Sequence, residues 1–109
     1  EAMKHFGTRI KKLHQKDLVK DSKNPVNMFD IVGKDTIIDQ KLWVGTKCND
    51  DFTEIGYGCM DIQSIIDTAN KIGSMDYIIL EQDATKLNQL ESVKRSMEGF
   101  HKFGGIVWE

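Results

Sequence analysis

The chain has 109 residues, a formal net charge of -2 and a sequence pI near 5.9, so it lacks the basic surplus of proteins that bind nucleic acid or anionic membranes. Its hydrophobic fraction of 39% and charged fraction of 29% indicate a globular chain, and no apolar run approaches the roughly 20 residues of a membrane span. Cys48 and Cys59 lack CxxC spacing, so we expect two reduced thiols in a cytoplasmic protein.

The first residues, 1–7, are typical of the last turn of a helix that ends at Gly7. Because almost no helix precedes this turn, we expect the chain to be the C-terminal piece of a longer protein. A short strand is predicted over residues 10–15, where the polar sequence His-Gln-Lys-Asp follows Leu13.

The middle of the chain carries two helix starts. Asn24 and Pro25 are suited to the N-cap and first position of a short helix that ends at Gly33. Asp61 is suited to cap a second helix, in which isoleucines recur at helical spacing until Gly73. Residues 48–51 are typical of a loop, and Gly56 and Gly58 of a tight turn before that second cap.

Residues 77–81 combine four apolar or aromatic residues with Glu81, a pattern that predicts a strand buried on both faces. The last helix is expected to bury a face formed by Leu90, Val93, Met97 and Phe100. Strands and helices then alternate along the chain, which predicts a parallel α/β unit.

The candidate functional residues lie at the ends of the predicted strands. Ligands of parallel α/β sheets bind at the carboxyl ends of the strands, where His14 and Glu81 lie. A carboxylate at such a position must be solvated, paired or metal-bound, since burying it bare is costly. A lone histidine there is more often a hydrogen-bonded structural residue than a ligand, so both interpretations of His14 stay open.

Four segments in order resemble one known family: residues 13–17 (LHQKD), 54–62 (EIGYGCMDI), 77–83 (YIILEQD) and 92–97 (SVKRSM). They are similar to the C-terminal part of the xylose-isomerase-like TIM-barrel proteins, the sugar phosphate isomerase/epimerase group. The resemblance covers about residues 9–103 and implies a fragment of a (β/α)₈ barrel. A barrel takes about 250 residues, so residues 1–109 would form a single partial domain, too short to close alone.

The family holds a divalent metal (Mn, Mg, Co or Zn) with two glutamates, an aspartate and a histidine. The resemblance implies that His14 and Glu81 are two of these ligands and that Glu81 is also the catalytic acid/base. The other two ligands would lie on earlier strands, so the site in this chain is expected to be incomplete. The implied substrate-binding positions are Lys16, Asp17, Glu54, Gly56 and Gly58.

The implied activity is isomerisation or epimerisation of a sugar, sugar phosphate or polyol by proton transfer between adjacent carbons. The isolated chain is expected to be inactive, to require the remainder of the barrel and to self-associate through an exposed apolar flank. Alternatives are an inosose-dehydratase-like lyase, an endonuclease-IV-like phosphodiesterase and a non-catalytic α/β interaction module. Three histidines and an acidic pI disfavour the phosphodiesterase.

Overall fold

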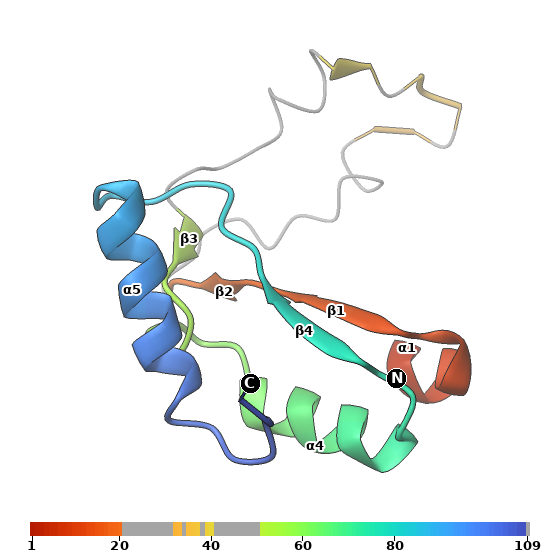
Figure 1. Ribbon diagram of the computed structural model, residues 1–109. Helices are drawn as coiled ribbons and strands as arrows, with labels where there is room; N and C mark the ends of the chain where they lie inside the picture. The colour runs from red at the N-terminus through yellow and green to blue at the C-terminus, as the bar shows by residue number, and fades with distance from the viewer. Residues whose placement is uncertain (21–31, 34, 38, 41–50, 109) are drawn as a thin grey trace.

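The computed structural model describes residues 1–20, 32, 33, 35–37, 39, 40 and 51–108 (Figure 1). The helix predicted to begin at Asn24 and Pro25, and most of the loop predicted at residues 48–51, lie outside these ranges. No helix in the described ranges is long and apolar enough to cross a membrane.

Two parallel strands form the centre of the fold. β1 (Lys12–Gln15) pairs with β4 (Tyr77–Leu80), and His14 lies opposite Ile79 in the register. The backbone bonds from Asp76 N to Lys11 O and from Glu81 N to Gln15 O extend this pairing at both ends. Figure 1 shows the two strands side by side, with α4 (Ile62–Ile72) in the connection between them. The predicted parallel α/β organisation is therefore confirmed.

Helix α4 begins and ends where the sequence predicts. The Asp61 carboxylate accepts hydrogen bonds from the Ser64 backbone N–H at 3.1 Å and the Ser64 hydroxyl at 2.7 Å. Gly73 ends the helix at φ +69°, a left-handed conformation that glycine adopts without steric cost. The buried residues of α4 are Ile62, Ile66 and Ala69, which share one helical face.

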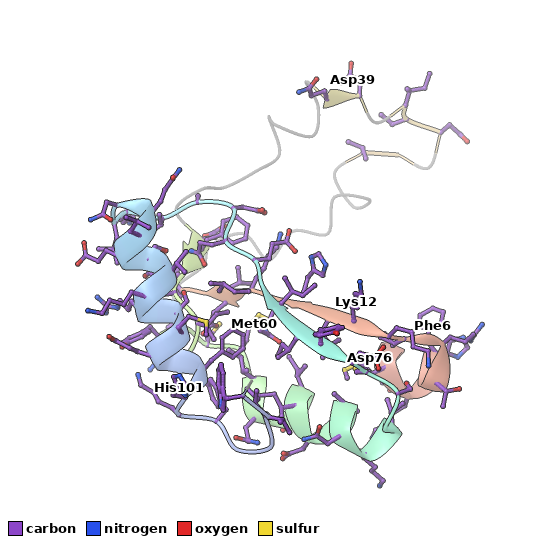
Figure 2. The ribbon with its side chains drawn as sticks, in the orientation of Figure 1. Phe6, Lys12, Asp39, Met60, Asp76 and His101 are labelled. Atoms are coloured by element: carbon purple, nitrogen blue, oxygen red, sulfur yellow. The ribbon has the colours of Figure 1, made fainter. Side chains whose placement is uncertain are left out.

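The core lies on one face of the sheet. Ile55, Ile62, Ile66 and Phe100 are buried together, and the partly buried residues packed on them are Ile78, Leu80, Met97, Phe103 and Ile106. The opposite face is exposed: Tyr77 is 63% accessible, and Figure 2 shows Lys12 pointing away from α4. The expectation that residues 77–81 are buried on both faces is thus wrong, because the described helices supply core residues to one face only.

Helix α5 (Gln89–Phe100) forms as predicted, but only part of the predicted face is buried, namely Phe100 and, in part, Met97. Leu90 is 85% exposed and Val93 is also exposed, whereas the buried residues are Ser92, Ser96, Gly99 and Phe100. The physical reason is close packing against residues 54–56, which requires small side chains. A Cβ on Gly99 would overlap the Ile55 carbonyl.

Short elements complete the described fold. α1 (Ala2–Phe6) is followed by a 3-10 turn (Gly7–Arg9), and α1 packs against α4. The helical end predicted at Gly7 is confirmed, with Gly7 at φ +52°. β2 (Asp17–Leu18) and β3 (Phe52–Thr53) form a small antiparallel pair next to the end of β1.

The contact between Gly99 and Ile55 gives a stability prediction. Gly99→Ala should lower the free energy of unfolding by about 2 kcal/mol or more, because the methyl group would displace the 54–56 backbone from α5. Gly104→Ala is the matched control, since a Cβ there would meet nothing within 4 Å. Urea denaturation measures both; equal effects of the two substitutions would contradict the packing described.

Candidate functional site

His14 and Glu81 lie together at the carboxyl ends of β1 and β4. Side chains alternate along a strand, so His14, Ile79 and Glu81 share the face opposite the core. The His14 Nδ1–H donates to Glu81 Oε2 across 2.7 Å. The pairing of these two residues, which the sequence implied only through strand ends and resemblance, is present in the structure.

Lys16 adds a cation to this pair. Its Nζ lies 2.9 Å from Glu81 Oε1 and 2.8 Å from Asp83 Oδ2. The hydrogen bond from Lys16, followed by that from His14, holds the pKa of Glu81 below its usual range. Burial alone would lower the pKa of Lys16, but the bonds to Asp83 and Glu81 outweigh it and raise that pKa. Both charges of the ion pair are therefore present at neutral pH.

Asp83 was missed as a candidate residue. It lies two residues after Glu81, so alternation would place both on the same face, as it does His14 and Lys16. The sequence therefore did contain a signal for Asp83: it follows Glu81 by two residues, just as Lys16 follows His14 by two residues. The four side chains form a cluster, called here the strand-end cluster: His14, Lys16, Glu81 and Asp83.

Asp17 organises a loop. Its carboxylate is 1% exposed and accepts four backbone N–H groups at 2.9–3.1 Å, those of Leu18, Gly56, Gly58 and Met60. A Cβ on Gly58 would overlap this carboxylate, and Gly56 has φ +81°. The structure therefore brings three of the implied substrate-binding residues together, in contacts that fix the backbone. Substrate binding by them stays a prediction.

Glu54 is the second buried carboxylate, at 7% exposure. Its Oε1 accepts hydrogen bonds from the Thr85 hydroxyl at 2.6 Å and the Ser92 hydroxyl at 2.9 Å. Burial favours the neutral acid, but these hydrogen bonds outweigh it and lower the pKa of Glu54. The adjacent Ile55 N–H donates to the Ser96 hydroxyl at 3.2 Å. Glu54 thus connects the loop to α5, and neither of these hydrogen bonds involves the strand-end cluster.

A cavity of about 300 Å³ lies elsewhere. Its walls come from α4, the start of β4 and residues 105–108, and include Ile66, Tyr77 and Trp108. None of the candidate site residues lines it. In the described structure the strand-end cluster is therefore a surface site, separate from this cavity.

The strand-end cluster contains residue types that can bind divalent cations. An imidazole nitrogen and a carboxylate oxygen are ligands for divalent cations, and two neighbouring ligands of one octahedral ion with bonds of about 2.1 Å are about 3 Å apart. The 2.7 Å between His14 Nδ1 and Glu81 Oε2 is a hydrogen-bond distance, so a cation bound by both atoms would have to replace the proton between them. No group of three or more His, Cys, Asp or Glu residues that could hold a metal occurs in the described part of the chain. Metal binding by His14 and Glu81 therefore stays a prediction.

Comparison with family models, with curated proteins and with solved structures found no match to this chain. Membership of the xylose-isomerase-like family therefore stays a prediction from the four sequence segments. The mixed α/β fold with a small parallel sheet rests on the structure itself.

Because Asp17 accepts four hydrogen bonds, even a nearly isosteric substitution at this position should destabilise the fold strongly. Asp17→Asn should lower the free energy of unfolding by about 2–4 kcal/mol, because an amide NH₂ replaces one acceptor and leaves buried N–H groups without a partner. Asp61→Asn is the control and should change little, since asparagine also caps helices well. Chemical denaturation of both variants checks this. A small effect of Asp17→Asn would show that the carboxylate does not organise the loop.

Glu54 predicts a pH dependence of stability. Its pKa is lowered on folding, so the stability it contributes is present above the unfolded pKa of about 4.3 and is lost as pH falls through the folded value. The free energy of unfolding should therefore fall more steeply in the wild type than in Glu54→Gln between about pH 5 and pH 3. Parallel pH profiles of the two proteins would contradict the lowered pKa.

Proposed function

We propose that this chain is the C-terminal part of a xylose-isomerase-like (β/α)₈ barrel, and that it contributes His14 and Glu81 to the divalent-metal site of a sugar or polyol isomerase or epimerase. The main support for this proposal is the 2.7 Å contact between His14 Nδ1 and Glu81 Oε2 at the carboxyl ends of neighbouring parallel strands. The supporting sequence evidence is the ordered resemblance of four segments.

The burial pattern of the sheet supports a place in a barrel wall. One face of each barrel strand packs on helices, and the other faces the barrel interior. Ile78 and Leu80 pack on core residues from α4 and α5, whereas Tyr77 and Ile79 are exposed on the face that carries His14. In a closed barrel this exposed face would line the interior, with Glu81 at the rim where active sites form.

Glu81 has the chemistry of a proton acceptor. Lys16 and His14 keep it ionised at neutral pH, and it is partly exposed, so a substrate carbon could approach it. A bound divalent metal would polarise adjacent carbonyl and hydroxyl oxygens of the substrate, which acidifies the neighbouring C–H. Glu81 would take that proton and return it to the adjacent carbon, giving isomerisation, whereas epimerisation would also need a second acid on the opposite face of the substrate.

Metal binding to the 109-residue chain tests this proposal. Isothermal titration with Mn²⁺ should show weak, saturable binding that His14→Ala and Glu81→Gln remove, because each variant loses one of two donors. His5→Ala and Glu98→Gln are the controls and should bind as the wild type does. A tight stoichiometric site in this chain would contradict the partial-barrel assignment, and unchanged binding in Glu81→Gln would contradict the role of Glu81.

Measuring substrate turnover by the whole barrel protein would distinguish an enzyme from a non-catalytic interaction module. Glu81→Gln should lower the rate of proton exchange or isomerisation by about a hundredfold to ten-thousandfold while circular dichroism stays unchanged. The assay uses a panel of ketoses, sugar phosphates and inososes, so dehydration of an inosose would show the lyase alternative. Full activity of the variant would favour a non-catalytic module.

A further inference from the structure

Lys16 contacts the carboxylate that the proposed metal site uses. Its ammonium lies 2.9 Å from Glu81 Oε1 while His14 holds Glu81 Oε2, so both oxygens of Glu81 have a partner. We infer that Lys16 acts through Glu81: it is a tethered cation that competes for this carboxylate and weakens the binding of a divalent cation by the His14–Glu81 pair. This inference rests on the proposed function.

The ammonium is held by more than Glu81. Asp83 Oδ2 lies 2.8 Å from Lys16 Nζ, and the Phe52 ring centroid of β3 lies 5.6 Å from it. These contacts would keep Lys16 at the cluster when Glu81 engages another cation. Its positive charge therefore stays close to any ion bound by the His14–Glu81 pair.

Two charges of the same sign then compete for one carboxylate. Removing a unit charge a few ångströms from a divalent ion strengthens binding even in a water-like dielectric. A purely structural role of Lys16 predicts the opposite, since loss of the contact would free the Glu81 side chain and weaken binding. The sign of the affinity change therefore separates the two roles.

The closing experiment compares Mn²⁺ binding to Lys16→Met and to the wild-type chain. Lys16→Met should bind Mn²⁺ about three- to tenfold more tightly, and Lys16→Arg should stay within about twofold because it keeps the charge. Lys12→Met is the matched control. It removes the same charge at the start of β1, four residues before Lys16 or about 13 Å along the extended chain, and should change the affinity by less than about 1.5-fold.

Equal or weaker Mn²⁺ binding by Lys16→Met would overturn the inference and leave the proposed function intact, provided Glu81→Gln removes binding. Binding by Lys16→Met where the wild type shows none would support the inference strongly. Absence of Mn²⁺ binding in both proteins would reject the His14–Glu81 metal pair and the inference with it.

A double variant locates the effect. Adding Glu81→Gln to Lys16→Met should cancel the gain in Mn²⁺ affinity, which places the effect of Lys16 at the Glu81 carboxylate. Lys16→Gln repeats the test if the methionine variant does not fold.

Discussion

The four backbone N–H groups that converge on the Asp17 carboxylate are the interaction on which the rest of the structure depends. Asp17 begins β2, two residues after the last residue of β1, and its partners Gly56, Gly58 and Met60 lead into the cap of α4. The bonds therefore fix where the chain leaves the first parallel strand and where the crossover helix begins. Since α4 leads to β4, they also contribute to the position of Glu81.

Three carboxylates of similar appearance in the sequence have three different roles. Asp17 is buried and satisfied by backbone donors, and Glu54 is buried and satisfied by two hydroxyl groups. Glu81 is partly exposed and is satisfied by Lys16 and His14. Buried carboxylates with neutral donors stabilise a loop, whereas an exposed carboxylate between cationic or ring donors can exchange its partners. This difference makes Glu81 the candidate for chemistry.

The sequence was sufficient wherever a local signal determined the structure. The cap at Asp61 and the stop at Gly73 fixed α4, and the apolar run after residue 76 located β4. Strand ends and resemblance together brought His14 and Glu81 to one site. Helical spacing located Phe100 and Met97 on the core side of α5. The burial of Ser92 and Gly99 could not be predicted in this way, because it depends on contacts with residues about 40 positions away. The structural role of Asp17 depended on similar long-range contacts.

The central claim is that His14 and Glu81 form a cation-binding pair on the open face of the sheet. Paramagnetic broadening by Mn²⁺ in the nuclear magnetic resonance spectrum of the isotope-labelled chain tests it most directly. The account predicts that signals of His14 and Glu81 broaden at the lowest Mn²⁺ concentrations, while the Trp108 indole, which lines the separate cavity, keeps its intensity at those concentrations. Broadening that begins at His5 or His101, or that is uniform along the chain, would contradict it.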